Sequence, residues 1–383
     1  MLELLKNPLI MAGVSIGVVM GAVLGACSYL IWLERKLSAW MQDRLGPNRV
    51  GPMGLLQPIA DGAKFLLKED VIPDHVNKFL YLLAPCIAVI TTMLAFAVVP
   101  FGPVSTEPGT FPFIIAPGVD LGIVFIFAVG SLAVYAVILG GWASNNKYSA
   151  LGSLRASAQV VSYEIPLGMS VVGLALLNHT MSVEKLLLIQ ADGGLGAWNV
   201  WYQPVAALIF FTAALAESNR LPFDLSECEQ ELIGGFHTEY SAMKFAMFFL
   251  AEYTHVITIS FLTIILFFGG WHFPFIAEVS SPWFLKVGVL LTKVLLVIVL
   301  IQMLRWTIPR FRFDQLMGLA WKVLIPMATV NVVIVMCVLE FGVARIWLLP
   351  LSLALFATVG LISTQGTLPR RVPEVAPAGA GHH

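Results

Sequence analysis

The stretch FLKVGVLLTKVLLVIVLIQMLR, residues 284–305, decides the kind of fold that this chain adopts. Apart from Lys286, Lys293 and Arg305, its side chains carry no charge. A helix rises about 1.5 Å per residue, so a segment of this length is roughly 30 Å long and matches the hydrocarbon core of a bilayer. The stretch therefore predicts a helix that spans a membrane.

Comparable apolar segments recur along the chain. Eight further candidates lie at residues 9–33, 79–101, 119–142, 157–178, 201–217, 243–269, 323–340 and 346–363. Helices are expected, because a membrane β-barrel needs shorter segments of alternating polarity. The predicted fold class is all-α, a polytopic integral membrane helix bundle of about nine transmembrane helices. Eight is the alternative count, since 201–217 is short and the last two segments nearly merge. Residues 1–364 are predicted to form a single helical membrane domain, followed by a disordered cytoplasmic tail at 365–383.

The composition agrees with a membrane protein and excludes several other classes. Of the 383 residues, 58% are hydrophobic and 12% are charged, whereas a soluble domain has about 25% charged residues. The formal net charge of −1 gives no support to nucleic-acid binding, which needs a basic excess. The four cysteines are scattered without a CxxC pair, which argues against a disulfide scaffold and against a zinc or iron–sulfur site.

Lysine and arginine residues in the loops predict the orientation. With nine spans, seventeen of them lie in the loops and C-terminal tail on one side of the membrane and four on the other. Because basic loops stay on the cytoplasmic side, the N-terminus is predicted outside. The long charged loops then face the cytoplasm or the mitochondrial matrix.

The first helix and the loop after it carry two patterns. Glycines recur every four residues from Gly13 to Gly25, a stripe that predicts close approach of a neighbouring helix. In the loop, Gly-Pro pairs within 44–52 predict turns, and residues 55–70 predict an amphipathic helix with Gln57 and Asp61 on its polar stripe. That helix is either a simple interfacial anchor or the mouth through which an amphiphilic molecule enters.

The third cytoplasmic loop, residues 216–240, is unusually acidic. Arg220 is its one basic residue, beside Glu217, Asp224, Glu227, Glu229, Glu231 and Glu239. Ser226 with Glu229 predicts a capping box that opens a short helix, which Gly234 and Gly235 would end. A solvated acidic face is one interpretation. Interleaved apolar residues favour another, in which carboxylates crowd inside the protein and share protons near neutral pH.

Three ionisable residues fall within predicted spans: Glu164, Glu252 and Lys293, with His255 one turn beyond Glu252. A charge at the bilayer centre costs about 2.5–3.5 kcal/mol on insertion scales, so each is expected to face the protein interior. A buried Glu–Lys ion pair is one interpretation. Together with Glu217, however, carboxylates at several depths are typical of a proton relay.

The fourth cytoplasmic loop, residues 305–322, concentrates arginine. Arg305, Arg310 and Arg312 are suited to anionic lipid headgroups or to carboxylates of a partner, although positive-inside anchoring needs only one or two of them. The sequence contains no GxGxxG motif after a strand, no P-loop, no metal-ligand cluster and no nucleophile triad. We therefore expect no metal, flavin, iron–sulfur cluster or NAD on this chain, and redox centres on other chains.

Four stretches together resemble one family closely. They are residues 32–70, 156–168, 216–245 and 305–322, and they are similar to the NuoH family of proton-translocating NADH:quinone oxidoreductase (respiratory complex I), whose mitochondrial counterpart is NADH dehydrogenase subunit 1. The resemblance spans roughly residues 8 to 340. It implies a subunit of an enzyme complex that has no catalytic residue of its own and lies as a multi-pass protein in the bacterial inner (plasma) membrane.

The resemblance also implies roles for particular residues. The chamber through which quinone, the substrate, enters would be lined by Glu34, Arg35, Arg44, Asp61, Phe249 and Arg305. The proton relay would use Glu164, Glu217, Asp224, Glu227, Glu229, Glu231, Glu239 and Glu252. Counter-charges or subunit contacts would be Arg220, Arg310 and Arg312. Implied partners are membrane lipids and other complex I subunits, especially NuoD, NuoB, NuoI and NuoA, and no nucleic acid.

Two features depart from the common pattern of the family. The segment at 346–363 and the tail exceed eight spans, and His237 adds a titratable group beside Glu239. Two other functions stay open at the sequence level. One is the equivalent subunit of a membrane-bound hydrogenase or of a ferredoxin-using photosynthetic complex. The other is an independent ion transporter, which the lack of internal repeats disfavours.

Overall fold

The computed structural model describes residues 8–103, 113–224 and 234–366. Within these ranges the chain is helical, with an isolated β-bridge between Phe273 and Ala277 and no longer strand. The α-helices are α1 Pro8–Met41, α2 Gln57–Leu67, α3 Lys78–Leu94, α4 Gly122–Ala143, α5 Lys147–Asn178, α6 Val183–Asp192, α7 Asn199–Tyr202, α8 Pro204–Glu217, α9 Ala242–Phe267, α10 Trp283–Thr307, α11 Phe313–Leu319, α12 Ile325–Glu340 and α13 Leu348–Gly366. A π-helical turn, Ala320–Leu324, joins α11 to α12, and short 3-10 turns lie at Pro52–Gly54, Ala95–Ala97, Leu195–Ala197, Gly235–His237 and Arg345–Trp347.

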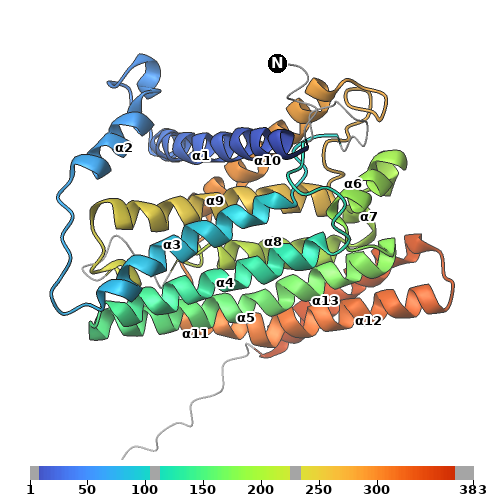
Figure 1. Ribbon diagram of the computed structural model, residues 1–383. Helices are drawn as coiled ribbons and strands as arrows, with labels where there is room; N and C mark the ends of the chain where they lie inside the picture. Colours follow the sequence, from blue (N-terminus) through green and yellow to red (C-terminus); the bar gives the residue numbers. More distant parts are fainter. Residues whose placement is uncertain (1–7, 104–112, 225–233, 367–383) are drawn as a thin grey trace, which may run out of the picture.

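The long helices lie side by side with their axes roughly parallel (Figure 1). Within the described residues, seven of them are long and apolar enough to span a membrane, and two shorter apolar helices, Pro204–Glu217 and Arg345–Leu361, accompany them. Each predicted span coincides with one of these nine helices, so the predicted class, an all-α polytopic membrane bundle, is confirmed. The number of crossings and the outside position of the N-terminus stay predictions.

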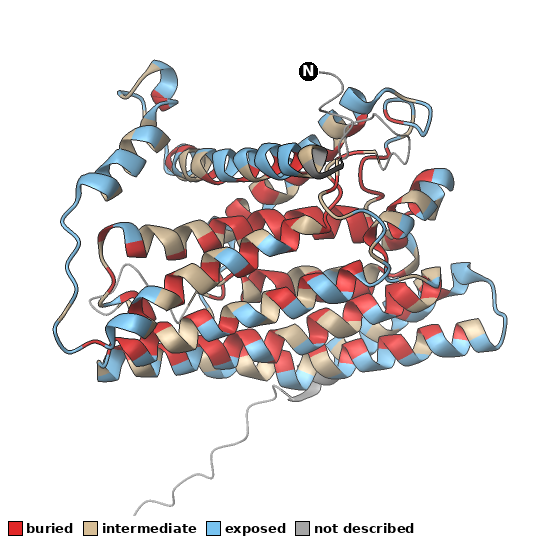
Figure 2. Cartoon of the chain, viewed as in Figure 1, coloured by how far each residue is buried: buried red, intermediate tan, exposed pale blue. Residues whose placement is uncertain are grey.

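Helices α5 and α9 form the centre of the bundle. Helix α5 packs against α4, α8 and α12, while α9 packs against α3, α10 and α1. Burial follows this arrangement, because α9 is covered along most of its length and the outer helices expose one face (Figure 2). The exposed faces carry apolar side chains such as Phe125, Leu132, Leu296 and Val333. A surface of this kind is stable in lipid and unfavourable in water.

The glycine stripe of α1 faces away from this bundle. A β-carbon added at Gly13, Gly17, Gly21 or Gly25 would meet no atom within 4 Å. The side of α1 that packs inward instead carries Val19, Val23, Cys27 and Leu30. The prediction that a neighbouring helix packs on the stripe is therefore wrong for the described part of this chain. The apolar residues at four-residue spacing, which bury more area than glycine, decide which face turns inward.

Helix α2 lies at the edge of the bundle near the end of α1, where it contacts α1 and α9 (Figure 1). It has no buried residue, and Ile59, Leu66 and Leu67 are exposed. The predicted amphipathic helix at 55–70 is confirmed, slightly shorter than expected. The predicted capping box at Ser226 and Glu229 and the predicted tail both lie outside the described residues.

A close backbone contact fixes the segment after residue 234 against α5. Gly235 has a φ of +60°, which favours glycine. Its Cα would lie 2.7 Å from a β-carbon placed on Gly152 of α5. Gly234 and Gly235, expected to stop a helix, thus allow the chain to approach α5 closely.

Gly152→Ala is expected to destabilise the protein by about 1–3 kcal/mol, the usual cost of overpacking a filled interior. The measurement is the thermal unfolding midpoint of the purified complex. Gly168→Ala is the matched control on the same helix, since a β-carbon there meets no atom within 4 Å. Equal midpoints for the two variants would contradict the close contact between Gly152 and Gly235.

Candidate functional site

Three cavities lie in the half of the bundle that contains the ends of α1 and α10 and the start of α9, and a fourth extends from Glu217 along α4 and α5 toward the opposite end. We call them the mouth, junction, central and flank cavities, of about 530, 120, 80 and 550 Å³. Glu34, Arg35, Arg44 and Arg305 line the mouth cavity beside the turn at 45–47. The other three lie successively among α8, α9, α5 and α4, as their lining residues show.

Glu34, near the end of α1, is held by three side chains. Its carboxylate accepts a hydrogen bond from the Tyr253 hydroxyl at 2.9 Å and forms ion pairs with Arg305 and, at 3.5 Å, with Arg220. The Glu34 side chain is only 13% exposed. The Arg220 guanidinium carbon also lies 4.2 Å from the centre of the Tyr253 ring, a cation–π geometry. These contacts join α1, α9, α10 and the loop after α8 at one point.

The junction cavity extends from this cluster toward Asp224. The pKa of Asp224 is raised to about 6, chiefly by burial and also by Glu252, while Arg310, Arg220 and Arg305 partly offset the rise. Asp224 is therefore poised to gain or lose a proton near neutral pH. Burial alone would lower the pKa of Arg220, yet the surrounding Glu34, Tyr253 and Glu252 raise it, so the guanidinium stays charged. Phe249 lines the same cavity.

Two histidine–carboxylate pairs lie at the central cavity, although His237 is not among the residues that line it. Nε2 of His237 lies 3.5 Å from Oε1 of Glu252, and Nε2 of His255 lies 3.5 Å from Oε1 of Glu217. Glu217 and His255 are both mostly buried. On the far side of Glu217 lies the flank cavity, which Glu164 of α5 also lines.

Several predicted site residues occupy other places. Asp61 of α2 does not line the mouth cavity; it binds Arg35 at 2.7 Å and Gln57 at 3.1 Å, which ties α2 to the end of α1. The carboxylate of Glu239 accepts a hydrogen bond from Asn146 at 2.7 Å and does not line the central cavity. Arg310 and Arg312 are exposed and line none of the four cavities. Glu227, Glu229 and Glu231 lie outside the described residues.

Among the described residues no carboxylate pairs with Lys293, so the Glu–Lys ion pair considered for it is not found there. Its ammonium donates instead to the carbonyls of Phe268, Gly270 and His272 at 2.8, 3.0 and 2.7 Å. A lysine has three N–H donors, and these carbonyls use all of them. The alternative interpretation of Lys293 is therefore wrong.

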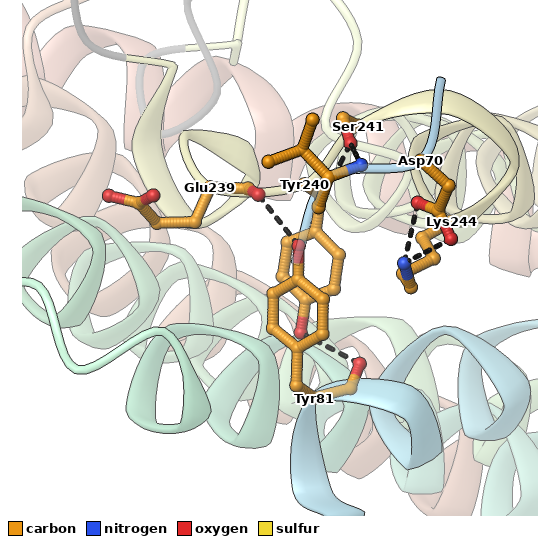
Figure 3. A network of polar contacts seen from close by, with 7 residues as sticks. Asp70, Tyr81, Glu239, Tyr240, Ser241 and Lys244 are labelled. Carbon is orange, nitrogen blue, oxygen red and sulfur yellow. Dashed lines mark hydrogen bonds and ion pairs between the residues drawn. The ribbon is translucent and has the colours of Figure 1, made fainter. Parts of the chain in front are cut away.

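A polar network fixes the start of α9 to the end of the first loop (Figure 3). Lys244 binds Asp70 at 2.5 Å, and the hydroxyl of Ser241 donates to the carbonyl of Val71. The rings of Tyr81 and Tyr240 stack at 4.2 Å between centroids. The hydroxyl of Tyr81 donates to the Glu239 carbonyl, and that of Tyr240 to the Tyr81 carbonyl. The sequence interpretation missed this network, because its members lie up to 174 residues apart.

Comparison with known proteins identifies the family. The model of the family described as NADH dehydrogenase matches residues 14–336. The chain is 46% identical over 346 residues to the second NADH-quinone oxidoreductase H subunit of Koribacter versatilis, covering 85% of this chain and 96% of that protein. It is 47% identical over 305 residues to the second such H subunit of Rhizobium meliloti, covering 80% and 90%.

The chain belongs to the NuoH family, the H subunits of NADH-quinone oxidoreductase. The first H subunit of Cytophaga hutchinsonii, 45% identical over 318 residues with 82% and 92% covered, agrees. The chain is thus a multi-pass inner-membrane subunit of the NADH:quinone oxidoreductase complex, complex I. These relatives favour that complex over the hydrogenase, the ferredoxin-using complex and the independent transporter.

Residues of this NuoH-family chain that the sequence interpretation left out of the site lie mainly on α9. Tyr253 binds Glu34, and His255 faces Glu217. His255 lies three residues after Glu252, so the helical period was a usable signal for it, whereas Tyr253 is adjacent to Glu252 in sequence and gave no such signal. Within the described residues no group of three or more His, Cys, Asp or Glu is arranged to hold a metal ion.

Proposed function

We propose that this protein lines the chamber through which quinone reaches its reduction site, and that it couples quinone reduction to proton translocation through buried carboxylates. The chain itself carries no redox centre in this proposal and binds no flavin, iron–sulfur cluster or NAD. Electrons reach quinone from other subunits, NuoD and NuoB among them. NuoI and NuoA are the further proposed neighbours.

One observation carries the proposal: each pair of successive cavities shares a carboxylate. Glu34 lines both the mouth and the junction cavities. Glu252 lines both the junction and the central cavities. Glu217 lines both the central and the flank cavities. A proton can therefore pass from one cavity to the next by binding and leaving a carboxylate at each boundary.

The arginines supply the link between the chamber and the relay. Quinone reduction takes up two electrons and two protons, and so changes the charge near the residues that line its chamber. Arg220 and Arg305 both pair with Glu34 and both act on Asp224. A change in charge beside this cluster alters the proton affinity of Asp224 and then of Glu252, because the interior has a low dielectric constant.

The proposed roles differ among the remaining residues. Phe249 lines the apolar part of the chamber, while Arg35, Arg44 and Asp61 shape its mouth, Asp61 by holding Arg35 and α2 in position. The relay ends at Glu164 in the flank cavity. The roles of Glu227, Glu229, Glu231 and Glu239 in the relay rest on the family resemblance. Exposed Arg310 and Arg312 are proposed to contact the hydrophilic arm.

Glu217→Gln and Glu252→Gln test the proposal. Each amide keeps the shape of the side chain but cannot carry a proton. We expect quinone reductase turnover and proton pumping to fall about tenfold, equivalent to ~1.4 kcal/mol of activation free energy. Both rates are measured in membrane vesicles. NADH oxidation with an artificial acceptor that bypasses the chamber reports the amount of assembled complex.

Glu340→Gln is the matched control, because Glu340 is exposed at the end of α12, away from the cavities. It is expected to leave both rates unchanged. Full turnover and full pumping in both relay variants would refute the proposed relay.

A further inference from the structure

His255 occupies the central cavity between two carboxylates of the relay. Glu252 and His255 are three residues apart on α9, so they lie one turn apart on the same face. Nε2 of His255 points to Glu217 at the end of α8, 3.5 Å from Oε1. The cavity is lined by all three side chains. The histidine thus lines the same cavity as both carboxylates and contacts one of them.

The central cavity has few other groups that can bind a proton. Of the described residues that line it, only Glu217, Glu252 and His255 are titratable, and most of the others are small or apolar. Gly130 faces Glu217, since a β-carbon on it would lie 3.6 Å from Oε1. An apolar surround strongly disfavours a free hydronium ion. Transfer between the carboxylates therefore needs a group that binds and releases protons.

Glu252 lies at the boundary between the junction and central cavities, and His237, which lines neither of them, contacts it there. His237 lies 3.5 Å from Oε1 of Glu252, and its ring is packed against Phe236, Phe245 and Phe248. These aromatic contacts fix the orientation of His237. Glu252 consequently remains near the cavity that contains His255.

We propose that His255 carries the proton between Glu252 and Glu217, an inference that rests on the proposed relay. Protonated Glu252 gives its proton to the unprotonated ring nitrogen of neutral His255, directly or through one water. His255 then releases the proton on Nε2 to the ionised carboxylate of Glu217. Glu252 ends as the carboxylate and Glu217 as the neutral acid. No electron moves and the total charge is unchanged. The histidine is left as its other neutral tautomer, and exchange of the proton from Nδ1 to Nε2 through water returns it to its first state.

The 3.5 Å separation suits this role better than a purely structural one. A strong charge-assisted hydrogen bond is about 2.7–2.9 Å long and would hold the proton in place. At 3.5 Å a small rotation of either side chain, or a bridging water, makes and breaks the contact. The pair is therefore arranged for repeated transfer.

His255→Gln tests the inference in the whole complex. Glutamine keeps a polar side chain of similar size but cannot accept and release a proton. We expect turnover with a short-chain quinone, and proton pumping, to fall about tenfold or more, because positioned acid–base groups commonly contribute about 10²–10⁴-fold. If proton transfer then limits the rate, the ratio of turnover in H₂O to turnover in D₂O should exceed that of the unaltered complex.

The control is His272→Gln, since His272 is also buried but lines none of the four cavities. The artificial-acceptor assay again reports assembly. Unchanged turnover in His255→Gln overturns the inference, and so does a lowered turnover with an unchanged solvent isotope effect. If His255→Gln is normal while Glu217→Gln is impaired, the relay stands and only the role of His255 fails. If Glu217→Gln and Glu252→Gln are both normal, the relay itself fails.

Discussion

Arg220→Met is expected to lower NADH–quinone turnover at least a hundredfold in the assembled complex. Arg220 binds Glu34 at 3.5 Å, stacks on Tyr253 and attracts Glu252 and Asp224. Breaking a buried charge pair by removing one partner costs about 3–5 kcal/mol, because the remaining charges lose their counter-charge. Methionine keeps the length of the side chain, so the loss is chiefly one of charge.

The same substitution has a second, directional consequence for pH dependence. Burial is the main cause that raises the pKa of Asp224 to about 6, and Arg220 is one of the charges that hold it from rising further. Without the guanidinium the pKa of Asp224 rises above that value, so Asp224 stays protonated to higher pH. Any step that needs ionised Asp224 is then lost as pH falls through this higher pKa. The pH–rate profile should therefore lose activity on its acidic side at a higher pH than in the unaltered complex.

Turnover is measured from about pH 5.5 to 8.5, a range that brackets the pKa of Asp224, and is normalised to NADH oxidation with the artificial acceptor. Arg345→Met is the control for the loss of an arginine, because Arg345 is exposed and distant from the cluster. A variant that assembles and keeps its turnover and its acidic limb would show that Arg220 is not the counter-charge of this site.

Much of the bundle could be predicted because hydropathy at helical length is a local property. Residues 284–305 predict α10 to within a few residues, and the polar stripe around Asp61 predicts α2. The glycine stripe of α1 led to a wrong prediction of close helix packing, because spacing alone does not determine which face of a helix turns inward. The larger apolar side chains around Val23 decided that.

The sequence could predict which residues belong to the site but not which of them contact one another. Buried carboxylates are conspicuous in a chain with 12% charged residues, so Glu164, Glu217 and Glu252 stood out. The partner of each is set by how helices cross, which local sequence does not determine. His237 meets Glu252 fifteen residues away, and Arg305 meets Glu34 across 271 residues. A carboxylate partner was one interpretation of Lys293, whereas the end of α9 supplies three carbonyls.

Lys293→Met is expected to destabilise the protein by about 3–5 kcal/mol, because three buried carbonyls would lose their donor at roughly 1–3 kcal/mol each, partly relieved by relaxation. Those carbonyls belong to the turn that ends α9, where Gly269 and Gly270 have φ values of +69° and +53°. Backbone carbonyls at the C-terminal end of a helix have no N–H partner within that helix. The ammonium also lies 4.3 Å from the ring centre of Trp198, so the substitution removes a cation–π contact as well.

Lys286→Met is the matched control, seven residues earlier on α10. Lys286 is buried, more so than Lys293, but its ammonium donates to one carbonyl, that of Val279, and lies over the ring of Trp271. The loss should therefore be about one third as large, since one carbonyl and not three is left without a donor. The comparison uses the amount of assembled complex in membranes and its thermal unfolding midpoint after purification. If the two variants lose stability equally, the effect reflects removal of any lysine from α10, and Lys293 does not act as the cap of α9. If only Lys293→Met is unstable, the helix that carries Glu252 and His255 depends on a cation at its opposite end for its fixed position.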